Sequence, residues 1–459
     1  MKSKVLIFLF AIGFFLISCN KVEHNPLKVS TINPRYFTDA SGKAIYLTGS
    51  HTWNNLVDMI EENNPAPFDY KAYLDFLKGY NHNFYRLWSW ELLNWDTNAN
   101  KDKKPENYKI NPHPWLRSGP GIAIDGEPAF DLTKFNESYF ERLRERVEKA
   151  QKYGFYVSIM LFEGWGIQFS PDAYSKHPFY PMNNINNLGL DTAETARLEI
   201  HELKHRRVVE IQEIYVKKVL ETVNDLDNVL CEISNENHPL STEWQYHMIR
   251  FIKDYEKLLG NQHPVGMTFQ YKGGSNQVLF DSPADWISPN NADGYRDNPP
   301  ASDGRKVIIT DTDHLWGIGG NIDWVWKSFL RGMNILFMDP YNGSVLFQDD
   351  LDWAKSMCKN LGYTRHFADK VDLINMVPSG NLSSTNYCLA NIGKEYIVYL
   401  PTDTTASLDL KDVSGKFKVE WFDPSSGASV EREDVQGGSD HLFNSPFHSG
   451  SAVLYLKKE

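Results

Sequence analysis

The chain has 459 residues, too many for one ordinary domain, but enough for a (β/α)₈ barrel of about 250 residues or more plus a second domain. Hydrophobic residues make up 41% of it, which allows a large core, and aromatic residues make up 14%. Aromatic rings stack on sugars but also fill large cores, so composition alone leaves both uses open. The formal net charge of −12 argues against a nucleic-acid partner, which would require a basic face.

The first nineteen residues are typical of a bacterial lipoprotein signal. Two lysines precede the apolar run 5–16, which is too short for an ordinary transmembrane span. The run ends in Leu-Ile-Ser-Cys at residues 16–19, which resembles the lipobox, whose cysteine is lipidated and becomes the mature N-terminus. We therefore expect a bacterial cell-envelope protein on the periplasmic or outer-surface face. Its lipid anchor would be on Cys19, followed by a tether over residues 20–30.

Three further cysteines, Cys231, Cys358 and Cys388, lie far apart in the sequence. Three cannot all pair, so we predict mostly buried thiols. Their spacing suggests no metal site, and we predict no cofactor.

Apolar segments with the length of buried strands alternate with segments of helical periodicity. The predicted strands cover residues 44–53, 83–90, 155–162, 229–233, 265–270, 286–290, 306–310 and 335–339. The predicted helices cover residues 70–79, 131–153, 192–223, 244–259, 322–332 and 350–361. Alternation implies parallel pairing, and eight strands suggest a closed TIM barrel over residues 31–370.

Two other regions break this alternation. Residues 36–47 predict a hairpin whose second arm leads into the first barrel strand. Residues 91–130 are rich in Asn, Pro, Lys and Gly and lack periodicity, so we expect a large loop over the active face, shaping the pocket together with residues 164–190.

Residues 373–459 predict a small antiparallel β-sandwich. Short strands recur at regular spacing, with turn residues between them. They cover residues 387–390, 395–400, 406–410, 417–422 and 452–456.

The strand at residues 229–233 runs directly into Ser234-Asn235-Glu236, and a second acidic tip, carrying Asp311 and Asp313, follows the strand at 306–310. Catalytic side chains of barrel enzymes lie at the carboxyl ends of the strands. Two carboxyl groups about 5–5.5 Å apart cleave a glycosidic bond with retention of configuration. Arg86, inside the second strand, is difficult to bury without a carboxylate partner and could keep the second acid ionised.

Asn235-Glu236 on strand four, Arg86 on strand two and an acid at the tip of strand seven resemble the clan A, cellulase-like (β/α)₈ glycoside hydrolases. The resemblance covers roughly residues 30–370. It implies that Glu236 is the acid/base, that Asn235 binds the sugar 2-hydroxyl and that the strand-seven acid is the nucleophile. The family uses Glu as nucleophile, whereas this chain has Asp. Position favours Asp311, with Asp313 second and Glu163 third.

The tail has a separate resemblance. Residues 396–401 and 421–427 are similar to the C-terminal β domain, labelled collagen-binding, that follows barrels such as the bacterial apiosidases. We interpret this domain as a module that packs against the barrel.

Other side chains at the predicted strand tips are candidates for carbohydrate binding. They are His51, Trp53, Trp88, Glu163, Trp165, His238, Gln270, His314 and Trp316. For any single tryptophan, core packing is an equal alternative.

Two alternative functions remain open. The first is a metal-dependent barrel hydrolase, with a divalent ion held by His51, His238 or His314 together with Asp311 and Asp313. Against it, the first strand has no His-x-His pair and no strand-end lysine could bridge metals. The second is a non-catalytic carbohydrate-binding lipoprotein, which would have lost one of the carboxylates.

Overall fold

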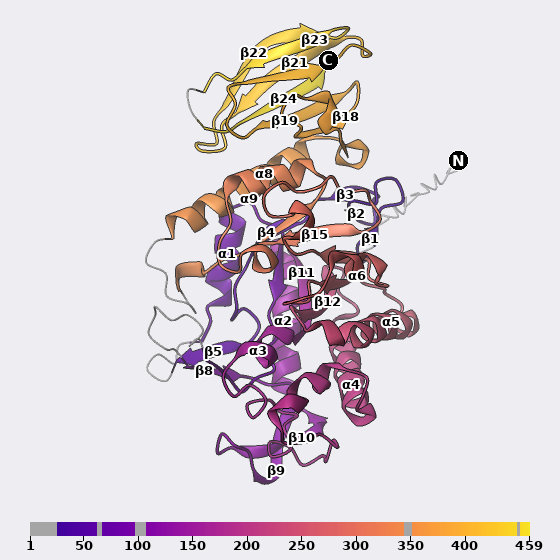
Figure 1. Ribbon diagram of the computed structural model, residues 1–459, viewed down its shortest axis with the longest axis vertical. Coiled ribbons are helices and arrows are strands. Elements are labelled where there is room, and N and C mark those ends of the chain that lie inside the picture. The colour runs from indigo at the N-terminus through magenta and orange to yellow at the C-terminus, as the bar shows by residue number, and fades with distance from the viewer. Residues whose placement is uncertain (1–24, 62–66, 97–106, 344–350, 448–449) are drawn as a thin grey trace, which may run out of the picture.

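The structure is a computed structural model that describes residues 25–61, 67–96, 107–343, 351–447 and 450–459 (Figure 1). The predicted signal sequence, Cys19 and the first part of the predicted tether lie outside these residues. Within the described ranges, no helix combines the length and apolarity needed to cross a membrane.

Eight parallel strands form the predicted barrel, in the order β4-β16-β15-β14-β13-β12-β11-β6. They are β4 (Thr48–His51), β6 (Phe84–Leu87), β11 (Tyr156–Glu163), β12 (Val229–Asn235), β13 (Val265–Thr268), β14 (Trp286–Ser288), β15 (Val307–Asp311) and β16 (Asn334–Met338). Their residues are almost all buried because helices cover the outside of the sheet while side chains fill the inside.

The first and second barrel strands meet through Asn83. Its backbone N–H donates to the carbonyl of Thr48 at 3.0 Å, and its side-chain Oδ1 accepts from the N–H of Thr48 at 2.9 Å. Gly49 allows this contact, because a Cβ there would lie 2.0 Å from the Phe84 carbonyl oxygen. This seam joins the amino-terminal ends of the first and second strands.

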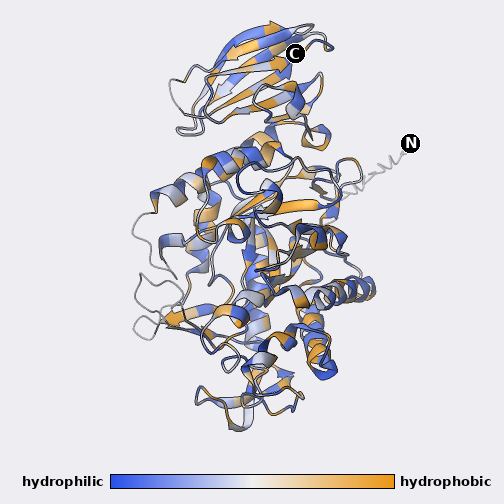
Figure 2. Ribbon diagram, in the orientation of Figure 1, coloured by the Kyte–Doolittle hydropathy of each residue, from blue (hydrophilic) through white to orange (hydrophobic). Residues whose placement is uncertain are grey.

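The helices are α1 (Tyr70–Gly79), α2 (Glu137–Tyr153), α3 (Gly164–Phe169), α4 (Arg206–Val223), α5 (Thr242–Leu259), α6 (Asn276–Asp281), α7 (Thr312–Leu315), α8 (Ile322–Leu330) and α9 (Asp352–Lys370). Long helices such as α4 and α5 carry both hydrophobic and hydrophilic residues (Figure 2), which is the pattern of a helix with one buried face. The predicted bounds of α1 are confirmed.

Two predicted helices, α5 and α8, differ from the structure by two residues at one end, and three others differ by more. The helix expected from residue 131 begins at Glu137, because residues 128–135 form a strand. The segment 192–223 is the short 3-10 helix η1 (Glu194–His201) followed by α4, and residues 202–205 interrupt the helix. The last barrel helix continues to Lys370, nine residues beyond the predicted end at residue 361.

The expectation of a structureless loop over residues 91–130 is wrong for the described part of that segment. The strand order β5-β8-β7 forms a small antiparallel sheet from β5 (Asp58–Glu61), β7 (Asn94–Asp96) and β8 (Asn107–Asn111). The strands β9 (Trp115–Ile122) and β10 (Pro128–Phe135) form a hairpin at the end of the molecule farthest from the C-terminus (Figure 1). Register shifts interrupt their pairing, which removes the alternation that reveals a strand in a sequence.

The N-terminal hairpin is confirmed by β2 (Phe37–Thr38) and β3 (Ala44–Ile45), which continue a small sheet begun by β1 (Lys28–Val29). In the C-terminal domain, six antiparallel strands form one sheet and two form another. The larger sheet contains β17 (Val377–Pro378), β18 (Cys388–Asn391), β19 (Glu395–Leu400), β24 (Ala452–Lys458), β21 (Lys416–Phe422) and β22 (Ser429–Gln436). The smaller contains β20 (Thr405–Asp409) and β23 (Asp440–Asn444). All five predicted strands are present, but β17, β22 and β23 were not predicted. β17 has only two residues, and the mostly exposed sequences of β22 and β23 lack apolar alternation.

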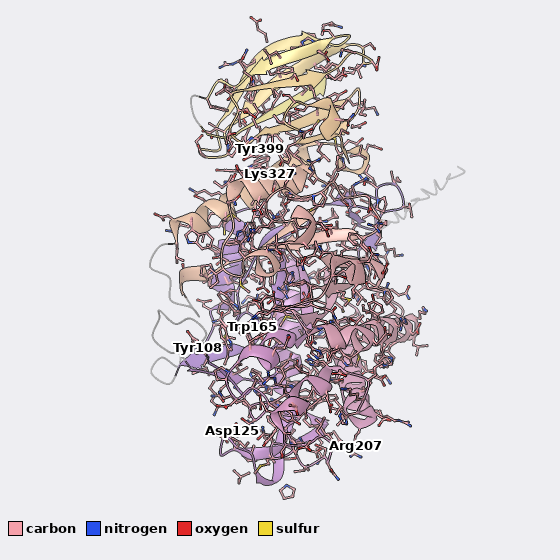
Figure 3. All side chains as sticks on the ribbon, viewed as in Figure 1. Tyr108, Asp125, Trp165, Arg207, Lys327 and Tyr399 are labelled. Carbon is pink, nitrogen blue, oxygen red and sulfur yellow. The ribbon has the colours of Figure 1, made fainter. Side chains whose placement is uncertain are left out.

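The C-terminal domain packs on α8 and α9 through aromatic side chains. Trp326 of α8 stacks on Tyr399 with ring centroids 6.0 Å apart, and Phe367 of α9 lies 5.3 Å from the ring of Phe422. Figure 3 labels Tyr399 and Lys327 at this junction, well away from Trp165 on the barrel. The contacts agree with the interpretation of this domain as a packing module.

Candidate active site

A pocket of about 520 Å³ opens at the carboxyl ends of the barrel strands. Three carboxyl groups line it, from Glu163, Glu236 and Asp313. Eight aromatic side chains line it as well: Trp53, Trp88, Trp90, Trp95, Trp165, Phe269, Tyr271 and Trp316. All of the lining residues lie between Trp53 and Met338, so the barrel builds this pocket.

Arg86 lies beneath the pocket, with 1% of its side chain exposed, and joins the second, fourth and seventh strands. Its Nε and Nη2 donate to the Glu232 carboxylate at 2.9 and 2.5 Å. Its Nη1 lies 3.2 Å from one oxygen each of Asp311 and Asp313. The expected partner at strand seven is therefore present, but the bidentate partner is Glu232 on strand four, which sequence reasoning missed.

His51 and Trp88 hold Asp311 from the side of the first two strands. Trp88 Nε1 donates to His51 Nδ1 at 2.8 Å, so His51 carries its proton on Nε2. That nitrogen donates to Asp311 Oδ2 at 2.9 Å. Trp88 thus contacts the pocket with one face and fixes the histidine tautomer with its indole N–H.

The two strand-seven acids have different surroundings. Asp311 ends β15 and caps α7, where its Oδ1 accepts the N–H of Asp313 at 3.0 Å. Burial alone would raise the pKa of Asp311, but His51 and Arg86 lower it below its usual range. Asp311 does not appear among the lining residues, whereas Asp313 does.

Asp313 retains more freedom than its neighbour. Its carboxyl group receives Arg86 Nη1, and His314 Nε2 lies 3.8 Å away. Burial and the nearby charge of Asp311 raise the pKa of Asp313 to about 6, although Arg86 opposes this shift. At neutral pH, Asp313 is therefore mainly a carboxylate that faces the pocket.

Glu236 has the surroundings of a proton donor. Burial, followed by the charges of Asp313 and Glu163, raises the pKa of Glu236 well above its usual value. The backbone at Glu236 is left-handed, with φ of 43°, which is strained for a residue with a side chain. A protonated carboxyl group beside an ionised one is the pairing that acid/base chemistry requires.

Glu163 is the third pocket carboxyl group. It caps the first turn of α3, where its oxygens accept the N–H groups of Trp165 at 2.9 Å and Gly166 at 2.6 Å. Burial raises the pKa of Glu163 to about 8, against the effect of these two donors.

Asn235 is fixed by its neighbours. Its Oδ1 accepts from Arg86 Nη2 at 2.7 Å and faces His314 Nε2 at 3.3 Å, so its amide nitrogen points the other way, toward Glu163. Burial lowers the pKa of His314 to about 3, so its ring is neutral. Its Nδ1 can therefore accept a hydrogen bond from Ser288 Oγ, at 2.7 Å. The amide of Asn235 is thus held in one orientation beside the pocket.

Four predicted binding residues lie outside the pocket lining. Arg86 and His51 contact the strand-seven acids beneath the pocket, and His238 and Gln270 contact other segments. His238 Nε2 faces the carbonyl of Leu198 at 3.0 Å, and Gln270 Nε2 donates to Thr242 Oγ1 at 3.0 Å. Both hold loops in place.

The cluster required by the metal-dependent alternative is not assembled. His238 is directed away from the strand-seven acids, and both ring nitrogens of His51 are occupied. Across the described ranges, no group of three or more His, Cys, Asp and Glu side chains is arranged to hold an ion. Cys231, Cys358 and Cys388 are free and buried, as expected.

Several pocket residues were not predicted from the sequence. They are Trp90, Trp95, Phe269, Tyr271, Asn291, Arg296, Leu315, Gly317, Ile318 and Met338. Trp90 was within reach of sequence reasoning because it ends the predicted second strand. Most of the others lie in loops, whose course is not encoded by periodicity.

Comparisons with known proteins agree with this architecture. Residues 99–282 match the family model "Domain of unknown function (DUF6298)", and residues 374–456 match "Putative collagen-binding domain of a collagenase". No curated protein matches by sequence. A solved glycoside hydrolase family 5 protein from Bacteroides vulgatus superposes with a TM-score of 0.65 at 12% identity, covering 95% of this chain and 93% of its own. Another solved structure, titled "Glycoside hydrolase", gives 0.61 at 13% identity, covering 95% and 97%. The chain therefore has the fold of these proteins, a (β/α)₈ barrel followed by a β domain.

Proposed function

We propose that this protein is a retaining glycoside hydrolase that cleaves O-glycosidic bonds in a poly- or oligosaccharide. The observation that carries the proposal is the pair formed by Glu236 and Asp313, which line one pocket with opposite protonation preferences. The aromatic pocket walls and the shared fold with proteins titled glycoside hydrolases support it.

In this mechanism Glu236 protonates the oxygen of the leaving group while Asp313 attacks the anomeric carbon. The glycosidic bond breaks as the bond between carbon and carboxylate forms, through a transition state with oxocarbenium character. Glu236, now ionised, then takes a proton from water, and that water releases the sugar from Asp313. Asn235, held by Arg86 and His314, would hydrogen-bond the sugar 2-hydroxyl.

We assign the nucleophile to Asp313 rather than to Asp311, the residue favoured by sequence position. A nucleophile needs a lone pair directed at the substrate. The oxygens of Asp311 receive His51, Arg86 and the N–H of Asp313, whereas Asp313 lines the pocket. Asp311 would instead fix the positions of Arg86 and Asp313.

Three alanine variants test these roles. With Glu236→Ala, an unactivated glycoside should lose most of its rate, whereas an activated aryl glycoside should still form the glycosyl-enzyme, and added azide should release it. Asp313→Ala should react with neither substrate. If Asp311→Ala shows this nucleophile phenotype and Asp313→Ala remains active, the assignment within the pair is wrong. Near wild-type activity of Glu236→Ala on the unactivated substrate would refute the mechanism.

The stereochemical outcome is tested separately. NMR of the first-formed anomer should show retention, and an inverted product would exclude the double displacement. A screen of plant and host polysaccharide fragments would identify the sugar, and insensitivity to chelators in the same screen would separate this mechanism from a metal-dependent one.

We also propose that the protein is lipid-anchored in the bacterial cell envelope through Cys19, on the basis of the signal sequence. Labelled palmitate should attach to the wild type but not to Cys19→Ala. Equal labelling of both proteins would exclude the anchor.

A further inference from the structure

A buried group of polar side chains ties together the two strand tips that carry Glu163 and Glu236. It lies beside the pocket and takes no part in the proton transfers described above. Its centre is Glu91, which follows β6 and has 6% of its surface exposed.

Glu91 collects donors from three other segments. Its Oε2 accepts the backbone N–H of Glu163 at 2.8 Å. The Nε2 atoms of His177 and His201 each lie 3.2 Å from one of its oxygens. These histidines lower the pKa of Glu91 to about 2, although burial opposes them, so Glu91 holds its partners as a carboxylate.

His201 extends this contact to the residue that follows Glu236. Asn237 Oδ1 accepts the N–H of His238 at 2.8 Å, which fixes the orientation of its amide. Asn237 Nδ2 then donates to His201 Nδ1 and to Ser234 Oγ, both at 2.9 Å. His201 therefore carries its proton on Nε2, toward Glu91. The Asn237 side chain is bonded to Ser234, which precedes Glu236 in the chain, and to His238, which follows it.

A second tie comes from α3. Gln168 Nε2 donates to the carbonyl of Gly164 at 2.7 Å and to the carbonyl of Glu236 at 2.8 Å. The two tips are also in close contact, because a Cβ on Gly164 would lie 2.4 Å from the Cα of Asn237. The amide of Gln168 thus holds the carbonyl of the residue whose backbone is strained.

A strained backbone persists only where its surroundings determine it strongly. At Glu236 the φ of 43° directs the side chain, and the hydrogen bonds around it lie on Glu236 itself, on Asn237 and on the neighbouring tip. Relaxation of this conformation would move the carboxyl group away from the leaving-group oxygen, and small displacements of a proton donor are costly in rate.

We propose that Glu91, His201, Asn237 and Gln168 form a brace that positions Glu236 for proton donation. This rests on the proposed function, in which Glu236 is the general acid. The members of the brace are positioning residues, because they act through Glu236 and contact no reacting atom.

The test compares two substrates that differ only in how much they need the proton. Wild type, Gln168→Met and His201→Gln are assayed on a dinitrophenyl and a phenyl glycoside of the same sugar, chosen from the screen above. The dinitrophenyl group leaves with little protonation, whereas the phenyl group requires it. A loss of folded enzyme lowers both rates equally, but a displaced general acid lowers mainly the rate on the phenyl glycoside.

Each variant has a matched control. Gln151 is half-buried like Gln168 and donates through Nε2 to Asp227, far from the pocket lining. His205 pairs with Glu199 at 2.7 Å and makes no hydrogen bond or ion pair with Glu91 or Asn237. Gln151→Met and His205→Gln should therefore retain the wild-type ratio of the two rates.

We expect both brace variants to lose at least about tenfold more kcat/KM on the phenyl than on the dinitrophenyl glycoside, which is part of the roughly 10²–10⁴-fold that general acid catalysis contributes. Equal losses on both substrates, or none, in Gln168→Met and His201→Gln would overturn the brace while leaving the proposed function intact. A wild type that cleaves neither substrate nor any other glycoside in the screen would overturn the proposed function, and the brace with it.

Discussion

Replacing Arg86 by Met removes the cation that Glu232, Asp311 and Asp313 share beneath the pocket. Methionine fills a similar length, so the loss is mainly electrostatic rather than a cavity. Arg86 is 1% exposed, and its guanidinium lies within 3.2 Å of oxygens of all three carboxyl groups. Removing one partner of a buried ion pair costs about 3–5 kcal/mol because the remaining charge is left uncompensated. We expect the free energy of unfolding to fall by about this amount at neutral pH.

The loss should depend on pH. Without Arg86, burial raises the pKa of Glu232 still further above its value in the unfolded chain, which is about 4. Asp311 loses one of the groups that lower its pKa but keeps His51. An acid whose pKa is raised by folding does not destabilise the fold when the pH is below its unfolded pKa. It destabilises the fold as the pH rises through its folded pKa. In the wild type, Arg86 opposes the raised pKa of Glu232 and helps to lower the pKa of Asp311, and the lowered pKa of Asp311 gives stability that is lost in acid. The gap between the two proteins should therefore narrow as the pH falls from 8 toward 4.

Urea unfolding followed by tryptophan fluorescence, at several pH values, would measure this gap. The double variant Arg86→Met/Glu232→Gln should recover part of the loss, because a neutral amide needs no counter-charge. Arg206→Met is the matched control, since the Arg206 side chain is 92% exposed and its pair with Glu210 should contribute little. A loss below about 1 kcal/mol for Arg86→Met, or a gap that widens in acid, would refute the reasoning.

Three further changes have defined outcomes. Gly164→Ala would place a Cβ 2.4 Å from the backbone of the neighbouring strand tip, so calorimetry should show a lower Tm, and an unchanged Tm would mean that the tip can move. The acid limb of the pH profile of kcat/KM should lie near pH 6, where Asp313 ionises. The alkaline limb reports the ionisation of Glu236. Glu163→Gln should shift this limb to lower pH, because it removes a negative charge that raises the pKa of Glu236. Trp326→Ala removes the stacking between the barrel and the β domain, so limited proteolysis should cut between them faster; wild-type resistance would show that other contacts suffice.

Much of the barrel was predictable because each strand is a short apolar run and each long helix has one buried face. The bounds of α1 follow from Asp69, which accepts the N–H of Ala72 at its start, and from the apolar spacing after it. The strands of segment 91–130 were not predicted in this way. β9 and β10 pair with register shifts and include prolines, and β7 and β8 are short. Their pairing partners are set by tertiary contacts that no local pattern encodes.

Part of the candidate site was also predictable from the sequence. Glu236 stands out because it directly follows the buried strand β12 as part of an Asn-Glu pair. The order of Asp311 and Asp313 could not be read from strand alternation, because the chain turns into α7 immediately after Asp311. Glu232 did leave a signal, since a charged residue inside a buried strand needs a partner and Arg86 was already known to need one. Glu91 left none, because it lies in a loop.

The left-handed backbone at Glu236 lowers the stability of the fold. A side chain in this conformation costs about 1–3 kcal/mol, and burying its carboxyl group costs more. A Glu236→Gly variant would relieve both, so it should be inactive on unactivated glycosides yet unfold at a higher temperature than the wild type. A trade-off of this kind between activity and stability is common at catalytic positions. The variant that lacks the general acid would then be more stable than the wild type, and it could bind an uncleaved saccharide for structure determination.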